Sequence, residues 1–170
     1  YTTNDQRDSS VTGLPNGDFV VTWRSTSQDG DDGGIYGQRF NSDGSTDGGE
    51  FRVNTTTAKT QEGGAVTALS NNGFVVTWTS YGQDNASQYE GGVYGQRYSE
   101  TGAPVGSEFL INSHTQSNQK HPAVTALDNG SFVVAWQSSE QDGQDYGVYG
   151  KVYSAGPGGL TDTATVSITV

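Results

Sequence analysis

The sequence predicts an all-β fold of three tandem repeats, each about 55 to 58 residues long and each a four-stranded antiparallel, blade-like sheet. One stretch is written three times, as Phe19-Val20-Val21-Thr22-Trp23, again at 74–78, and at 132–136 with Ala before the Trp. The three tryptophans are 55 and 58 residues apart. No segment shows a useful helical periodicity. Units of this kind occur in β-propellers and in three-fold prisms, and the sequence leaves the closure open.

The first half of each unit reads as a β-hairpin. The first strand is expected at 11–14, 66–69 and 124–127, and a turn rich in Asn and Gly follows it. These residues tolerate the positive φ of tight turns, so the turn is a strong hairpin signal. The repeated Phe-Val-Val-Thr-Trp stretch is the second strand. Both of its faces are mostly apolar, which predicts a sheet packed on both sides.

The second half of each unit adds two further strands. The third strand is expected at 35–40, 93–98 and 148–153, and the fourth at 50–54 and 108–112. The third unit lacks this fourth-strand signature. Alternating β-branched residues at 161–170 stand in its place, and they predict a substitute fourth strand or a strand exchanged with another chain.

The predicted organisation is a domain at 1–160, with units at about 7–61, 62–119 and 120–160, followed by a C-terminal strand at 161–170. The chain begins at Tyr1 and contains no Met, which suggests a processed product or a piece of a longer protein.

Composition permits one globular domain. At 170 residues the chain can bury a real core. Hydrophobic residues make up only 31%, but the 11% aromatic content argues against disorder. There is no Cys, so disulfides are excluded, and no apolar run approaches a membrane span.

The charge balance limits the partners. The net charge is −11, from eight basic and nineteen acidic residues. Nucleic acid and direct membrane insertion are therefore not expected, because phosphate binding needs a clustered basic surface and a span needs a long apolar run. Divalent cations are plausible partners, since carboxylates are their usual ligands.

Several repeated motifs resemble repeat units of large secreted bacterial proteins with RTX-type or cadherin-like adhesin regions. The resemblance covers residues 1–153 and is carried by the Asn-Gly turn, Phe-Val-Val-Thr-Trp, Ser25-x-x-Gln28-Asp29-Gly30, 35–40, and Glu50-Phe51-x-Val53-Asn54. It implies an extracellular or cell-surface setting, adhesion or matrix roles, and often calcium. No catalytic motif transfers with it, and the RTX nonapeptide Gly-Gly-x-Gly-x-Asp is absent.

The loop after each Trp carries two acidic positions in register. The pairs are Asp29 with Asp32, Asp84 with Glu90, and Asp142 with Asp145. Paired carboxylates in a Gly-rich loop suit calcium, which takes hard oxygen ligands on flexible loops. The alternatives are a solvated turn in which Asp caps backbone amides, or pairing with Arg39 and Arg97.

The same loops supply the candidate ligand-binding residues. These are three tyrosines outside the repeat pattern and three repeated glutamines: Tyr81, Tyr89, Tyr146, Gln28, Gln83 and Gln141. A loop aromatic has no packing role imposed by the repeat, whereas the repeated tryptophans are expected in the core. His114 and His121 fall in a single connector and are expected to have polar roles there.

These observations favour a non-catalytic, calcium-stabilised extracellular module that binds a glycan or peptide. The alternative is a structural protomer of a fibre or surface layer, joined to neighbouring copies by strand exchange through 161–170. An enzyme is not expected, because no Gly-x-Ser-x-Gly or His-Glu-x-x-His motif occurs and three equivalent acid pairs are unusual for a glycosidase.

Overall fold

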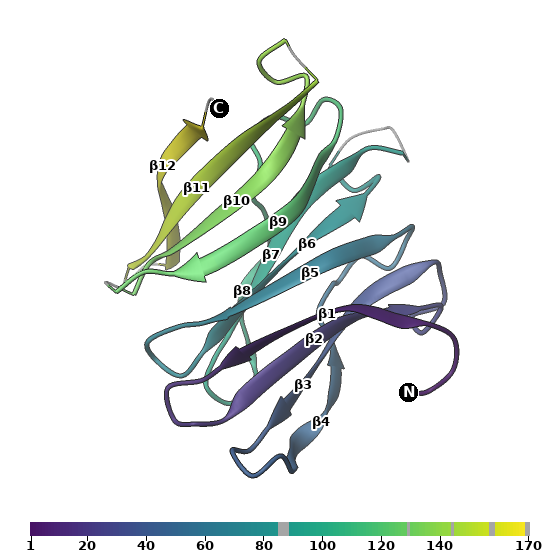
Figure 1. Cartoon of the computed structure of the whole chain (residues 1–170), viewed down its shortest axis with the longest axis vertical. Helices are drawn as coiled ribbons and strands as arrows, with labels where there is room; N and C mark the ends of the chain where they lie inside the picture. The colour runs from purple at the N-terminus through teal and green to yellow at the C-terminus, as the bar shows by residue number, and fades with distance from the viewer. Residues whose placement is uncertain (85–88, 129, 144, 157–158, 169–170) are drawn as a thin grey trace.

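The computed structural model describes residues 1–84, 89–128, 130–143, 145–156 and 159–168, with side chains to residue 154. The described residues form three four-stranded antiparallel sheets, which follow one another along the molecule (Figure 1). The prediction of an all-β fold with three blade-like sheets is confirmed. The strands are β1 (Gln6–Gly13), β2 (Phe19–Thr26), β3 (Gly33–Phe40), β4 (Thr46–Arg52), β5 (Gln61–Ala68), β6 (Phe74–Tyr81), β7 (Gly91–Tyr98), β8 (Pro104–Leu110), β9 (Gln119–Ala126), β10 (Phe132–Ser139), β11 (Tyr146–Gly156) and β12 (Gly159–Ile168).

Each sheet is a simple meander, ordered β1-β2-β3-β4, β5-β6-β7-β8 and β9-β10-β11-β12. The first strands of the three sheets are neighbours, with β5 between β1 and β9 (Figure 1). β12 pairs with β11 as the fourth strand of the third sheet. It covers the predicted strand 161–170 as far as Ile168, and residues 169–170 lie outside the described part of the chain.

The core lies between the sheets. In the second sheet, Phe74, Val76 and Trp78 are fully buried against the first sheet. Val75, one residue out of phase, belongs instead to the cluster shared with the third sheet. This alternation explains why both faces of the repeated strand are apolar: one face packs on the preceding sheet and the other on the following sheet.

Buried amide side chains lie at the junctions where one sheet leads into the next. The Ile35 N–H donates to Asn54 Oδ1 at 2.7 Å, and Asn54 Nδ2 donates to Gln61 Oε1 at 3.0 Å. Gln61 is fully buried and in turn donates to the Ala58 carbonyl at 3.0 Å. Asn112 repeats the first of these bonds with Val93 at 2.6 Å. The repeated Asn and Gln thus satisfy buried backbone groups at the junctions.

A β-bulge interrupts the first strand of every sheet. Asp8, Gly63 and His121 occupy equivalent positions and have φ values of 55°, 63° and 55°. The strand pairing shifts register at each of them. These strands begin earlier than predicted, at Gln6, Gln61 and Gln119. The prediction missed their first halves because these halves are polar and have no hydrophobic alternation. Bulges of this kind redirect side chains, and they are common beside functional sites.

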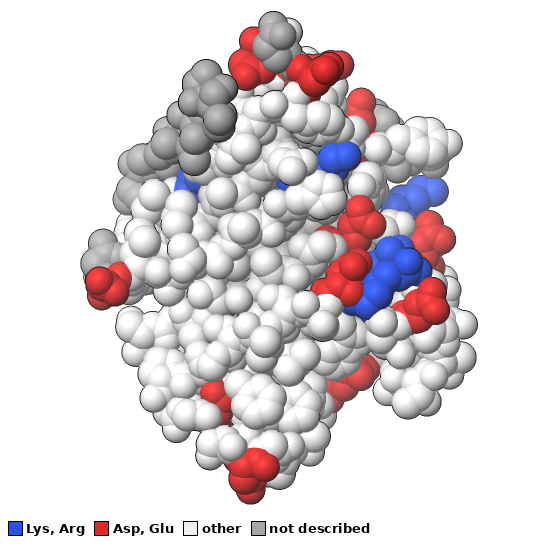
Figure 2. Space-filling model, viewed as in Figure 1, with Lys and Arg blue, Asp and Glu red and all other residues white. Residues whose placement is uncertain are grey.

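The loops fall at two ends of the sheets because successive strands run in opposite directions. The β2–β3, β6–β7 and β10–β11 loops lie at the same end as the connectors at 53–60 and 111–118, and we call this the loop end. Figure 2 shows basic and acidic side chains together on the right of the view, at this end, whereas the middle of the visible face carries few charges. Within the described residues, nothing forms a helix long and apolar enough to cross a bilayer.

Candidate functional site: a polar pocket between the first two sheets

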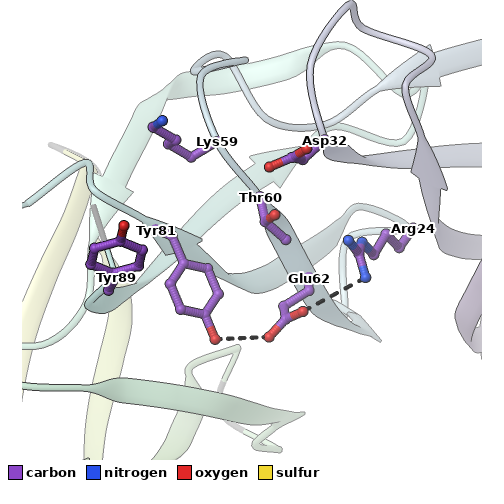
Figure 3. Close-up of a pocket in the computed structure, with 7 residues that line it drawn as sticks. All are labelled: Arg24, Asp32, Lys59, Thr60, Glu62, Tyr81 and Tyr89. Atoms are coloured by element: carbon purple, nitrogen blue, oxygen red, sulfur yellow. Dashed lines mark hydrogen bonds and ion pairs between the residues drawn. The ribbon is translucent and has the colours of Figure 1, made fainter. Parts of the chain in front are cut away.

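A pocket of about 500 Å³ opens at the loop end, between the first and second sheets. We call it the Glu62 pocket. Its lining comes from β2, the β2–β3 loop, the connector before β5, β5 itself, the end of β6 and the β6–β7 loop (Figure 3). The lining residues are Arg24, Asp32, Lys59, Thr60, Glu62, Tyr81 and Tyr89.

Glu62 is held from two sides. The Tyr81 hydroxyl donates a hydrogen bond of 2.9 Å to Glu62 Oε1, and Arg24 Nη1 lies 3.7 Å from Glu62 Oε2 (Figure 3). The Arg24 side chain is 14% exposed and that of Glu62 is 30% exposed. The carboxylate is therefore fixed in direction while it remains open to the pocket.

Arg24 owes its position to a glycine on the neighbouring strand. A Cβ at Gly33 would lie 2.5 Å from Arg24 Nε, so only glycine leaves room for the guanidinium there. Arg24 Nε is buried and has no hydrogen-bond partner among the described residues. Gly33 also forms a parallel bridge with Thr60, which brings the β2–β3 loop against the connector. The pocket wall is thus built by the contact between two sheets.

Tyr81 acts as a hydrogen-bond donor over the whole physiological range. Burial, followed by the hydrogen bond and charge of Glu62, raises the pKa of Tyr81 to about 12. The charge of Tyr146 makes a smaller contribution in the same direction. Tyr146 also lies under Lys120, whose Nζ is 5.1 Å from the ring centroid, a cation–π contact. Tyr146 is 53% exposed and Tyr89 77% exposed, so aromatic surface is available at this end.

The pocket is built from positions where the repeats disagree. Glu62 corresponds to Arg7 and Lys120 in the other units, and Arg24 corresponds to Thr79 and Gln137. The packing positions of the same strands keep their residue types. Of the predicted site residues, Asp32, Tyr81 and Tyr89 lie together in this pocket. Arg24, Lys59, Thr60 and Glu62 were missed, and these departures from the repeat are the signal that could have identified them.

The three predicted glutamines hold the loops in place. Gln28 donates to the Glu50 carboxylate, and Gln83 donates to Glu108 at 2.6 Å. Gln141 accepts a hydrogen bond of 2.8 Å from Ser138. None of these three lines the Glu62 pocket.

The first acidic residue of the β2–β3 loop and that of the β6–β7 loop each turn toward their own sheet. Asp29 Oδ2 packs so closely against Gly34 that a Cβ added there would lie only 2.5 Å from it. Asp84 packs in the same way on Gly92. Asn112 Nδ2 donates to Asp84 Oδ2 at 3.2 Å. Burial, partly offset by this hydrogen bond, raises the pKa of Asp84. Both carboxylates therefore anchor their loops.

The second acidic residue of each loop closes the hairpin through its backbone. The carbonyls of Asp32, Glu90 and Asp145 accept N–H groups from across the loop at 3.2, 3.0 and 3.1 Å. Asp142, the first acidic residue of the third loop, is exposed. The alternative that these acidic loop residues pair with Arg39 does not hold, because Arg39 forms its ion pair with Asp47 at 2.9 Å.

Calcium binding stays a prediction. Among the described residues, no group of three or more His, Cys, Asp or Glu side chains could hold a metal ion. Thermal melting with and without EDTA tests the prediction, which requires a clear drop in melting temperature on chelation.

Asp84→Asn is expected to make the protein more stable at neutral pH. Because its pKa is raised in the folded state, Asp84 stays protonated there after the unfolded chain has ionised. The stability of the natural protein therefore falls as pH rises through the folded pKa, and this loss persists above it. The Asn variant escapes the loss and retains an acceptor for Asn112. Unfolding free energies at pH 3.5 and pH 7 should show the advantage only at pH 7.

Asp43→Asn is the matched control. Hydrogen bonds from Ser45 lower the pKa of this exposed carboxyl, so its substitution should have the opposite pH dependence. An Asp84→Asn variant that is less stable than the natural protein at pH 7 would contradict the account.

The architecture matches solved structures of propeller-like, carbohydrate-active enzymes. The endo-arabinase of Bacteroides thetaiotaomicron VPI-5482 is similar with a TM-score of 0.55 at 14% identity, over 84% of this chain and 55% of that one. An endo-1,4-β-xylanase from the same organism gives 0.58 at 12% identity, over 95% and 60%. An α-L-arabinofuranosidase from Lactobacillus brevis gives 0.59 at 12% identity, over 93% and 55%. No family model and no curated protein matches the sequence.

These similarities establish the fold, and the chain spans about 55 to 60% of the length of these enzymes. They also correct three predictions from the sequence. The resemblance to RTX or cadherin-like adhesin repeats is wrong, because the similar structures are arabinanase- and xylanase-type proteins, among them a thermostable family-43 glycoside hydrolase. The non-catalytic adhesion module, with its fibre alternative, and the exclusion of an enzyme are contradicted by the same glycoside hydrolases. A glycan ligand, in contrast, is consistent with these neighbours.

Proposed function

We propose that this chain belongs to a carbohydrate-active propeller that binds a glycan in the Glu62 pocket and hydrolyses a glycosidic bond there. One observation carries the proposal. Two carboxylates, Asp32 and Glu62, come from different sheets and line the same pocket beside the tyrosines Tyr81 and Tyr89.

Two carboxylates are what glycoside hydrolysis needs. One protonates the leaving oxygen, and the other activates water or attacks the sugar, with the two carboxyl groups roughly 5 to 9.5 Å apart. Glu62 is the better placed for the second role, because Tyr81 and Arg24 fix its direction. Asp32, exposed on the loop opposite, is assigned the proton transfer.

The remaining lining suits a sugar. Tyrosine rings offer an apolar face and a polar edge, which match the two kinds of surface on a pyranose or furanose. The side chains of Arg24 and Lys59 both line the pocket (Figure 3). Both can donate hydrogen bonds to sugar hydroxyls.

The fold supports the choice of substrates. The similar structures are named for action on arabinan, xylan and arabinofuranosides, so pentose-containing polysaccharides are the first to test. An extracellular setting agrees with such substrates and stays a prediction.

The test is release of reducing ends from arabinan, xylan and a panel of hexose polysaccharides. The natural chain should release sugar from at least one of them, and the Asp32→Asn/Glu62→Gln double variant should not. Asp43→Asn/Glu100→Gln makes the same chemical changes in turns at the opposite end and should retain the activity. No release from any polysaccharide by a folded chain, or equal release by both double variants, would contradict the proposal.

A further inference from the structure

Each internal interface is formed by one face of an earlier sheet and one face of a later sheet. The outer faces of the first and third sheets carry the same kinds of residues as these two faces. At each internal interface, the later sheet contributes Phe, Val and Trp from its second strand. The earlier sheet contributes aliphatic side chains, which are Leu14, Val20, Ile35 and Val53 at the first interface and Leu69, Val75, Val93 and Ile111 at the second. One pattern of packing thus serves both junctions.

The outer face of the first sheet carries the Phe, Val and Trp side chains that a later sheet contributes at an internal interface. Phe19, Val21 and Trp23 are only partly buried, whereas Trp78 is 0% exposed at the equivalent position of the second sheet. Val11 is 65% exposed. Its equivalent in the second sheet, Val66, is only 8% exposed.

The outer face of the third sheet carries aliphatic side chains at the positions that an earlier sheet contributes to an internal interface. Leu127 is 37% exposed, against 5% for its equivalent Leu69. Val148 is 36% exposed, against 0% for its equivalent Val93. The chain therefore carries both members of a complementary pair of surfaces, one at each end.

Hydrogen bonds between neighbouring first strands follow the same one-directional pattern. Thr12 Oγ1 accepts the Ala68 N–H at 3.1 Å, and Thr67 Oγ1 accepts the Ala126 N–H at 3.3 Å. Thr125 is the next threonine in this series and lies on the third sheet. Gly13 is the equivalent of Ala68 and lies on the first sheet. The donor and the acceptor for one further hydrogen bond of this kind are thus present, one at each end of the chain's row of sheets.

We propose that two copies of this chain dock head to tail, with the first sheet of each on the third sheet of the other. A second copy is the partner because this chain itself carries the matching face. Two such junctions related by a two-fold axis use all four outer faces and close a ring of six sheets, within the four to eight blades of closed propellers. This proposal does not depend on the proposed function.

The test is the mass of the full chain in solution by size-exclusion chromatography with light scattering, from about 1 to 100 µM. We expect a species of twice the 17.9 kDa chain mass. Val11→Lys and Leu127→Glu should each convert it to the monomer, because both junctions contain both residues. Val105→Lys is the matched control, since Val105 is 41% exposed on β8, away from these faces, and it should leave the dimer intact.

A double variant with opposite charges at the two positions gives a second readout. Val66 and Leu14 share one core cluster, so Val11 of one copy should meet Leu127 of the other. The Val11→Lys/Leu127→Glu double variant should therefore regain dimer that each single variant loses. A monomeric natural chain, larger open assemblies, or a dimer that survives both single variants would overturn the proposal, with circular dichroism confirming that each variant is folded.

Discussion

Trp78→Ala is expected to cost about 3 to 5 kcal/mol of folding free energy, a large share of the stability of a domain this size. Trp78 is fully buried and belongs to the core cluster between the first and second sheets. Removing the indole leaves a cavity that two packed sheets cannot close. Denaturant unfolding monitored by circular dichroism measures the loss.

Trp23→Ala is the matched control, because Trp23 occupies the same repeat position on the open outer face. It is only partly buried, so its loss should be clearly smaller. The comparison is best made in the Val11→Lys background, in which the chain is expected to be monomeric. Equal losses at the two positions would contradict the assignment of an internal and an open face.

Glu62→Gln is expected to lower kcat by about 10²- to 10⁴-fold on whichever glycan the chain cleaves, with a much smaller effect on KM. Glutamine keeps the shape of the side chain, and its carbonyl oxygen can still accept the Tyr81 hydrogen bond. It removes the negative charge and the basic oxygen that the chemistry requires. Steady-state kinetics on the active polysaccharide measure the change.

Glu100→Gln serves as the control, since Glu100 is exposed in the turn between β7 and β8. It should leave both kinetic parameters unchanged. A Glu62→Gln enzyme with the natural kcat would remove Glu62 from the chemistry while leaving the fold untouched.

The repeats made the fold predictable. Phe-Val-Val-Thr-Trp alternates faces, and both faces are buried because each sheet lies between others, as at Val75 and Val76. The Asn and Gly turns and the repeated Asn54 and Gln61 mark strand ends and sheet junctions. Each of these residues has a packing or backbone role, so local pattern and global fold agree.

The pocket was harder to predict because the part of β5 that lines it lacks the sequence pattern of a strand. The first half of β5, with Glu62 followed by a bulge at Gly63, has no hydrophobic alternation, and it begins at the boundary predicted between the first two units. Arg24 and Lys59 reach the pocket only through contacts between the first and second sheets. Such contacts between distant segments are not visible in any single stretch of sequence.

The same residues explain why the family resemblance misled. The motifs that carried it build hairpins, cores and junctions, and any blade of this architecture needs them whatever its chemistry. Residues that serve folding carry little information about function, which depends on the site. The acidic loops also contribute to folding, because the Asp29 and Asp84 carboxylates turn back onto their own sheets.

The most direct test of the central claim is a crystal structure of the Glu62→Gln variant soaked with an arabinan or xylan oligosaccharide. We predict a sugar ring in the Glu62 pocket, with a glycosidic oxygen facing position 62 and the rings of Tyr81 or Tyr89 against the sugar. A pocket that stays without sugar at saturating concentration, or a sugar bound only outside the Glu62 pocket, would contradict it.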